Sequence, residues 1–206
     1  MKFPTRKYGD AREYFSGYFD NLTEAARSME TSSVAQAAEL IAYLFSKGHT
    51  LYVCGNGGSA AIANHLLCDF SKGIQTDTAL RPKVVSMSAS VELITAIGND
   101  IDFAEIFAYQ VRTAARAGDA LMTISSSGNS ENIVRAIEWA RRENIKTIAM
   151  TGFDGGRSAK LADINIYVPA QNYGVVEDIH QSIMHILAQY VRASLMDSGL
   201  IERRPF

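Results

Sequence analysis

Short apolar runs alternate with stretches of helical periodicity along most of this chain. The apolar runs are rich in aliphatic and β-branched residues, and they predict five strands at Leu51–Cys54, Val84–Met87, Ala120–Ile124, Thr147–Met150 and Ile164–Val168. Helical stretches separate successive strands. Because such connections form right-handed crossovers, this order predicts a parallel sheet covered by helices on both faces. The expected fold class is therefore α/β, doubly wound, with a mainly parallel sheet.

Two helices are expected before the first strand. Apolar residues recur at helical spacing between Ala11 and Lys47, and Thr31–Ser33 interrupts them with residues that favour a helix N-cap. Further helices are expected at Ser90–Ala96, Phe103–Arg116 and Glu131–Arg142, together with a short helix and a long final helix. We expect Gly98–Asp100 to terminate the first of these.

The chain is long enough for a substantial core in one domain. It has 206 residues, of which 47% are hydrophobic and 20% charged, so we expect a single domain spanning residues 1–206. Residues 1–48 would form a helical N-terminal extension. Because a helix that precedes the sheet has little of its own domain to cover, we expect its apolar positions to serve in oligomerisation.

The charge and the apolar runs exclude several classes of partner. A formal net charge of −2 provides no field for a polyanion, so nucleic acid is not expected as a partner. No apolar run reaches the roughly 18 residues that span a bilayer, and the first residues lack a signal-peptide core. Cys54 and Cys68 do not indicate a disulfide scaffold. We therefore expect a cytoplasmic protein with no membrane partner.

Two β-to-α turns share glycine and serine. Gly55–Ser59 follows the first strand, and Ser125–Ser130 follows the strand that starts at Ala120. Both turns must lie beyond the carboxyl ends of parallel strands, where ligands of open α/β sheets bind. Glycine permits close approach to the backbone, and a helix start offers free N–H groups. Hydroxyls and amides without a lysine suit a phosphate monoester.

The two common nucleotide-binding motifs do not fit these turns. Gly55–Ser59 lacks the last glycine of a dinucleotide-binding fingerprint, no acidic residue ends the next strand, and no Gly-Lys-Ser/Thr of a P-loop follows. Ser127 or Ser130 alone could simply cap a helix. Several serines within six residues at one strand end favour a ligand instead.

His65 and Asp69 place a nitrogen base and a carboxylate beyond the first turn. They are four residues apart in the expected helix, so their side chains lie on one face. Such a pair alone is more often structural. It gains weight because three of the four histidines, His65, His180 and His185, fall beside the first turn or on the last helix.

The combination of motifs resembles a known family. Cys54–Ser59 paired with Ser125–Ser130, then Thr151–Gly156 and a C-terminal helix with two histidines, is similar to the sugar isomerase (SIS) domain. Within it, nearly the whole chain resembles the phosphoheptose isomerases, which interconvert sedoheptulose 7-phosphate and D-glycero-D-manno-heptose 7-phosphate for heptose and glycan biosynthesis. The resemblance implies an aldose–ketose isomerase that is a homotetramer with active sites between subunits.

The resemblance also assigns site residues. It implies phosphate binding by Ser59, Ser125, Ser127 and Ser130 and sugar contacts from Asn56 and Asp100; Gly57, Gly58 and Ser126 complete the expected substrate-binding set. It implies a zinc ion held by His65, Asp69, Glu177 and His185, with Asp69 and His185 as the proton-transfer pair. Two imidazoles and two carboxylates are a reasonable zinc donor set.

Helix geometry leaves one ligand open. Glu177 is about 80° from His185 around a helix axis, whereas Asp178 is about 20° away, so Asp178 is a rival for the same role. The chain also departs from the isomerases. It has Asp69 for a glutamate, Glu177 for a glutamine, Gly73 beside Lys72 for an arginine, and Gly174 for an aspartate.

The expected mechanism is aldose–ketose isomerisation. A base removes the proton next to the carbonyl, an enediol(ate) forms, and the proton returns to the neighbouring carbon, with zinc stabilising the developing oxyanion. The departures from the family keep an alternative open. Some SIS proteins are non-catalytic binding or regulatory proteins, which sense a phosphosugar or associate with a replication initiator; an absence of zinc would favour that class.

Overall fold

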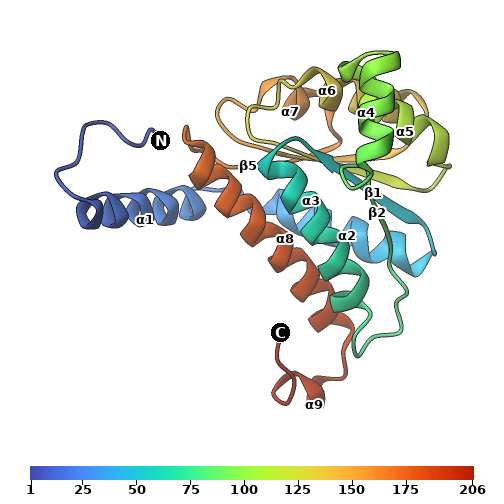
Figure 1. Ribbon diagram of the computed structural model, residues 1–206. Coiled ribbons are helices and arrows are strands. Elements are labelled where there is room, and N and C mark those ends of the chain that lie inside the picture. The colour runs from blue at the N-terminus through green and yellow to red at the C-terminus, as the bar shows by residue number, and fades with distance from the viewer.

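The fold is a parallel sheet with helices on both faces (Figure 1). The computed structural model describes residues 1–206. Five strands pair in the order β2-β1-β3-β4-β5, and every pairing is parallel. The strands are β1 (Thr50–Gly55), β2 (Lys83–Ser86), β3 (Ala120–Ser125), β4 (Lys146–Thr151) and β5 (Ile164–Tyr167). The predicted fold class is confirmed, and each predicted strand agrees with the observed one to within about one residue at either end.

The strand order creates a topological switch point between β1 and β3. From β1 the chain winds outward to β2, and from β3 it winds the other way to β4 and β5. Helices that follow β1 and β3 therefore lie on opposite faces of the sheet. In the register of these two strands Gly55 lies beside Ile124, so the turns that follow them open side by side.

Two layers of helices cover the sheet. One face carries α2 (Ser32–Ser46), α3 (Gly58–Cys68) and α8 (Tyr173–Leu195), with α1 (Ala11–Arg27) packed on α8. The other face carries α4 (Val91–Asp100), α5 (Ile106–Ala114), α6 (Glu131–Arg142) and α7 (Gly156–Leu161). Shorter elements are a π-helical turn, Asp69–Ile74, a 3-10 turn, Phe103–Glu105, and α9, Ser198–Ile201. The apolar clusters under the two layers contain 29 and 14 buried residues, so the α8 side holds the larger core.

Two helix predictions need correction. α4 does not end at Gly98 but continues to Asp100, because the Ile101 N–H still bonds to the Ile97 carbonyl. The segment predicted as one helix from Phe103 begins instead as a 3-10 turn, and α5 ends at Ala114. Asp102 caps that turn by accepting from the Ala104 N–H at 2.9 Å.

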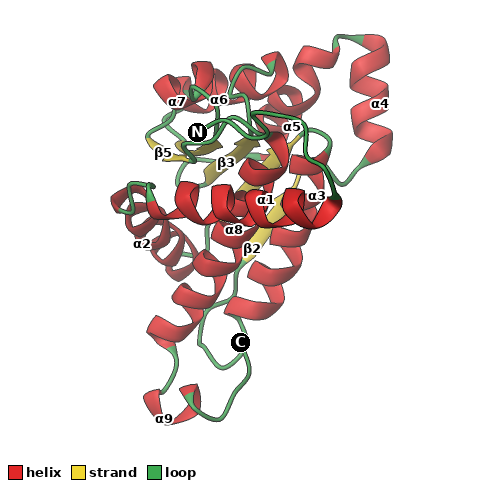
Figure 2. Cartoon of the chain, turned by 90° about the vertical axis from the view of Figure 1, so that its left-hand side faces the viewer, coloured by secondary structure: helices red, strands yellow, loops and turns green.

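The N-terminal helix α1 lies outside the layered part of the molecule. It crosses α8, as Figure 2 shows, and the Tyr18 hydroxyl donates to Asp178 of α8 at 2.6 Å. Gly174 makes this approach possible, because a Cβ there would lie 2.9 Å from the Tyr18 hydroxyl. Phe15 and Phe19 of α1 are 63% and 49% exposed. None of the helices combines the length and the apolar character that crossing a membrane requires.

Gly128 provides a test of the turn after β3. Gly128 and Gly48 both have positive φ, 64° and 74°, but a Cβ at Gly128 would lie 2.1 Å from the Gly155 carbonyl oxygen, whereas Gly48 faces open space. Gly48→Ala should lower the free energy of unfolding by about 1–2 kcal/mol through backbone strain. Gly128→Ala should cost at least about 2 kcal/mol more through overpacking. Urea unfolding of the two variants measures both costs, and equal losses would contradict the packing argument.

Candidate active site

A small cavity lies at the switch point, where the two serine-containing turns meet. It has a volume of about 160 Å³ and is lined by Asn56, Ser59, Ile124, Ser125, Ser126, Ser127, Ser130, Tyr173 and Glu177. This set includes every serine that the sequence assigned to substrate binding. Ser59, Ser125 and Ser126 are buried, so the surrounding packing restricts their side chains. We call it the serine cavity.

Polar pairs between the turns hold the serine cavity in shape. The amides of Asn56 and Asn132 bond to each other reciprocally, at 2.9 and 3.0 Å, and thereby connect the turn after β1 to the start of α6. Ser88 bonds to both the N–H and the carbonyl of Gly55. Asn56 was expected to contact the sugar, but here its amide is engaged with Asn132. Neither Asn132 nor Ser88 was predicted, because no local pattern marks a partner 76 or 33 residues away.

The serines after β3 are not used as helix caps. Ser130 occupies the N-cap position of α6, yet its side chain makes no capping hydrogen bond. The Ser126 hydroxyl is buried and has no partner in the protein. Ser127 accepts only a long bond from the Asn129 N–H, at 3.3 Å. Because an unpaired buried hydroxyl is costly, the Ser126 hydroxyl is a candidate hydrogen-bond donor to a ligand.

The amino end of α3 closes the serine cavity with backbone groups. Gly57 is its N-cap at φ 53°, and no side chain caps the helix, so the first N–H groups are available to an anion. The Glu177 carboxylate lies against Gly58, since a Cβ there would be 2.6 Å from Glu177 Oε2. Burial, and then the neighbouring charge of Asp178, raise the pKa of Glu177.

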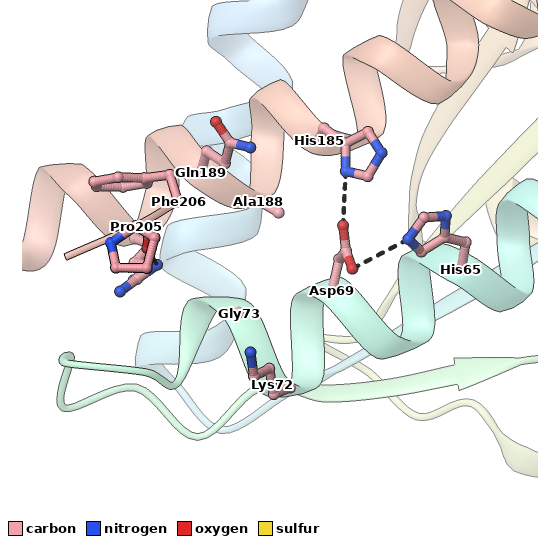
Figure 3. Close-up of a pocket in the computed structure, with 10 residues that line it drawn as sticks. His65, Asp69, Lys72, Gly73, His185, Ala188, Gln189, Pro205 and Phe206 are labelled. Carbon is pink, nitrogen blue, oxygen red and sulfur yellow. Dashed lines mark hydrogen bonds and ion pairs between the residues drawn. The ribbon is translucent and has the colours of Figure 1, made fainter.

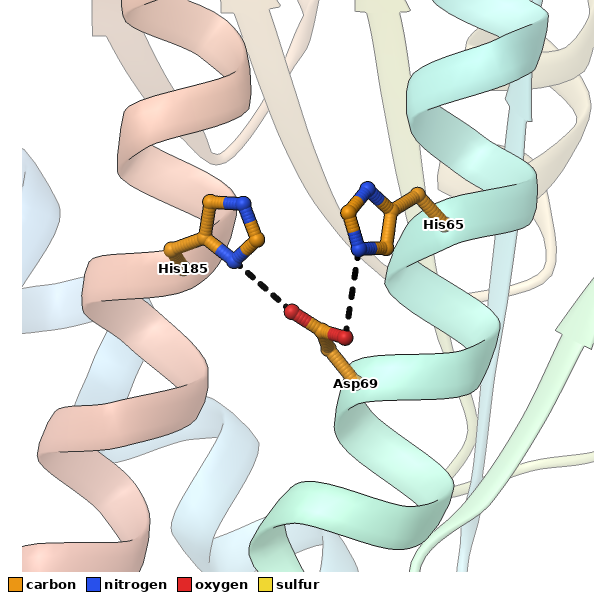
Figure 4. A group of neighbouring side chains, drawn as sticks. All are labelled: His65, Asp69 and His185. Atoms are coloured by element: carbon orange, nitrogen blue, oxygen red, sulfur yellow. Dashed lines mark hydrogen bonds and ion pairs between the residues drawn. The ribbon is translucent and has the colours of Figure 1, made fainter. Parts of the chain in front are cut away.

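A second group of polar side chains joins α3 to α8 (Figure 4). His65 Nε2 lies 3.3 Å from Asp69 Oδ1, which confirms the predicted i, i+4 arrangement. His185 of α8 lies with Nδ1 2.7 Å from Asp69 Oδ2. One donor atom from each of these three side chains falls within 4.8 Å of the others, so the donor set and its spacing fit a metal ion.

The other two candidate ligands lie elsewhere. Glu177 lines the serine cavity and is not part of the group formed by His65, Asp69 and His185. Asp178 accepts from Tyr18, so it faces α1. Asp100, predicted to touch the sugar, lies at the exposed end of α4, accepts a hydrogen bond from its neighbour Asn99 and does not line the serine cavity.

Gln181 contacts the histidines instead. Its Nε2 lies 2.8 Å from His65 Nδ1 and 3.1 Å from His185 Nε2. Sequence reasoning did not identify this residue. The available signal was its position four residues before His185, which places both side chains on one face of α8.

The histidine group opens into a larger cavity of about 370 Å³. Figure 3 shows the histidines and Asp69 at one end of this cavity and Phe206 with Pro205 at the other. Arg192 fixes the far wall. Its guanidinium bonds to the carbonyls of Thr76 and Pro205 and to Asp77, and stacks on the Phe206 ring at 4.8 Å. Lys72 also lines the cavity.

His180 does not belong to the site. It is fully buried, and its Nε2 lies 3.3 Å from the Thr151 carbonyl. Burial lowers its pKa to about 4, which keeps the imidazole neutral. Of the three histidines that the sequence grouped together, two therefore meet at the site and one supports the core behind it.

Comparison with known proteins agrees with this fold and site. The SIS domain family model matches residues 13–152. The phosphoheptose isomerase of Nitratidesulfovibrio vulgaris is 39% identical, over 84% of this chain and 77% of its own length. That of Laribacter hongkongensis is 37% identical over 89% and 96%. The structure of phosphoheptose isomerase GmhA from Neisseria gonorrhoeae superimposes with a TM-score of 0.80 at 31% identity, covering 88% of this chain and 96% of that one.

The fold and the family model place the chain in the SIS class, and its relatives indicate an aldose–ketose isomerase. Within that class the relatives described above are all phosphoheptose isomerases, and each alignment covers most of this chain and most of the relative. The chain belongs to the phosphoheptose isomerase family. The alternative of a non-catalytic SIS protein is not favoured by these relatives.

The pKa of His180 predicts a pH dependence of stability. An ordinary histidine takes up a proton near pH 6.5, whereas native His180 does so only at about pH 4. The unfolded state therefore binds more protons as the pH falls below 6.5, and stability is lost in that window. Between pH 7 and pH 5 this residue should cost about 2 kcal/mol. In urea unfolding, His180→Gln should show a correspondingly smaller loss than the wild type, and parallel curves would contradict the assignment.

Proposed function

We propose that this protein interconverts sedoheptulose 7-phosphate and D-glycero-D-manno-heptose 7-phosphate through an enediol(ate), for heptose and glycan precursor biosynthesis. The observation that carries the proposal is the 2.7 Å contact between Asp69, which follows α3, and His185 of α8, because both helices also border the serine cavity. The names of the relatives support the substrate.

The serine cavity suits the phosphate. Ser59 and the serines of Ser125–Ser130 surround a space with no basic side chain in its lining, and the open amino end of α3 supplies backbone donors. Hydroxyls and N–H groups can therefore bind the phosphate oxygens. This would anchor one end of the substrate at the carboxyl edge of the sheet.

α8 sets the distance between the proposed phosphate site in the serine cavity and the group of His65, Asp69 and His185, where the substrate would react. Glu177 borders the serine cavity and His185 follows it by eight residues, about 12 Å along the helix axis at 1.5 Å per residue. A sugar phosphate extended along this face would reach the histidine group with its carbonyl end. Gln181 lies midway between Glu177 and His185 along the helix.

Asp69 and His185 are the proposed proton-transfer pair. A carboxylate and an imidazole at hydrogen-bond distance can remove the proton next to the carbonyl and return one to the neighbouring carbon. The contact to His185 also fixes the direction of the Asp69 carboxylate, whose side chain is one methylene shorter than the glutamate implied by the resemblance.

We propose Zn²⁺ as the cofactor, held by His65, Asp69 and His185. The spacing of their donor atoms and their chemistry fit this ion. When bound, the ion would polarise the substrate oxygens and stabilise negative charge on them. Glu177, the fourth ligand implied by the resemblance, would need to leave the serine cavity to join them.

The first experiment follows turnover of sedoheptulose 7-phosphate by NMR in deuterated buffer, with the metal content of the same sample. Turnover with deuterium incorporated next to the carbonyl supports the enzyme and its proton transfer. Absence of turnover with that ketose phosphate would refute the proposed substrate.

Asp69→Asn tests the proton-transfer pair. The amide cannot act as a base, so kcat should fall by about 10²–10⁴-fold. Asp178→Asn is the matched control, because Asp178 bonds to Tyr18 and lies outside the group; it should retain kcat within a few fold. If Asp69→Asn were active and Asp178→Asn inactive, Asp178 rather than Asp69 would be the carboxylate of the proton-transfer pair.

We also propose a homotetramer assembled through the N-terminal extension and α8. A groove of about 510 Å³ between α1, α2 and α8 is lined almost entirely by apolar side chains, among them Leu22, Met29, Ile183, Ile186 and Tyr190. Contiguous exposed apolar surface of this kind marks interaction sites. A second copy of the chain would cover it.

Tyr190→Asp tests the proposed assembly. Tyr190 and Tyr43 are equally exposed, at 59%, but only Tyr190 lines the groove. A charge in the groove would be buried without a partner, so Tyr190→Asp should shift the protein to smaller species in size-exclusion chromatography with light scattering. Tyr43→Asp should leave the mass unchanged, and the same mass for both variants and the wild type would exclude this surface.

A further inference from the structure

Four side chains form a closed ring between α3 and α8. His65 and His185 each lie between Asp69 and Gln181. In each imidazole, one ring nitrogen faces Asp69 and the other faces Gln181. His65 directs Nε2 to Asp69 and Nδ1 to Gln181. His185 directs Nδ1 to Asp69 and Nε2 to Gln181.

This ring makes the two imidazole tautomers depend on Gln181. A neutral imidazole has one N–H and one lone pair, so the nitrogen that faces Gln181 determines what faces Asp69. The two ends of the glutamine amide have nearly the same shape. With its NH₂ toward the rings, the amide donates to both, and both ring N–H groups face Asp69. With its oxygen toward the rings, the amide accepts from both, and both lone pairs face Asp69.

Only the second arrangement presents three electron-pair donors to one point. His65 Nε2, His185 Nδ1 and the Asp69 oxygens then surround the same space, since one donor atom from each side chain lies within 4.8 Å of the others. We propose that Gln181 is the positioning residue of the metal site, and that its Oε1 accepts hydrogen bonds from both metal-binding histidines. The inference rests on the zinc site of the proposed function.

Gln181 acts behind the histidines and is not itself a ligand in this arrangement. Its amide faces the ring nitrogens opposite to those that face Asp69, so it lies on the outer side of both rings. Glu177, one helical turn earlier, lies against Gly58 in the serine cavity and does not reach them. Removal of such an outer partner typically weakens metal binding by about 10–100-fold.

The test is the zinc affinity of four variants, measured by competition with a chromogenic chelator. Gln181→Leu removes the acceptor and should weaken zinc binding by about 10–100-fold. Gln181→Glu keeps an acceptor but has no N–H, so it should bind zinc at least as tightly as the wild type. Gln189→Leu and Gln189→Glu are the matched controls, because Gln189 lines the same cavity on α8 without a hydrogen bond to either imidazole. Both should stay within about threefold of the wild type.

The outcomes separate this inference from the proposed function. Weak binding by Gln181→Glu, equal to that of Gln181→Leu, would assign a donor role and overturn the inference. So would wild-type affinity in Gln181→Leu, or equal tightening by Gln181→Glu and Gln189→Glu. In both cases isomerase turnover by the wild type would leave the proposed function standing. A wild type that binds no zinc would overturn the inference together with the proposed cofactor. If Gln181→Leu does not fold, Gln181→Met removes the same acceptor with less change of shape.

Discussion

The adjacency of β1 and β3 is the constraint on which the site depends. Because the chain winds away from these two strands in opposite directions, their carboxyl ends lie together with no crossover above them. The Gly55–Ser59 turn and the Ser125–Ser130 turn thus share one space. The paired amides of Asn56 and Asn132 then hold the turns at a fixed separation. A sheet with β1 and β3 apart would divide the serines between two unrelated loops.

α8 extends this space into a site with two ends. Tyr173, Glu177, Gln181, His185 and Gln189 follow one another at intervals of four, in a row that turns by about 40° around the helix axis at each step. The first two border the serine cavity, the next two belong to the ring with His65 and Asp69, and the last lines the larger cavity. The rest of the helix surface carries the apolar residues of the core and of the groove. A single regular helix therefore fixes the distance between the serine cavity, the proposed phosphate site, and the polar group proposed for acid–base and metal-binding chemistry.

The elements that rest on local patterns could be predicted from the sequence. Strand positions followed from runs of aliphatic residues, and the meeting of the two serine turns followed from the parallel order, so the serine lining of the cavity was predictable. The contact between His65 and Asp69 followed from helical spacing. These predictions succeeded because each depends on the period of one element or on a rule that holds for every doubly wound sheet.

Prediction from the sequence was weaker for hydrogen-bond partners that lie far apart in the chain. Helical phase placed Asp178 on the side of His185, but Tyr18, 160 residues away, bonds to Asp178. Nor could it show that His180 faces the Thr151 carbonyl while Gln181 contacts both site histidines. The phase of a helix gives the direction of a side chain only approximately. The neighbour that it meets is decided by the packing of other elements, which a single sequence does not display.

The same helix connects the proposed assembly to the proposed chemistry. One face of α8 carries Ile186 and Tyr190 in the apolar groove, while His185 on the neighbouring face contacts Asp69 at 2.7 Å. Tyr18 holds α1 to α8 through Asp178. Proton transfer is sensitive to displacements of about 1 Å. Any contact that shifts α8 along its axis therefore changes the Asp69–His185 distance directly, so a surface that fixes α8 in an oligomer also fixes the geometry of the acid–base pair.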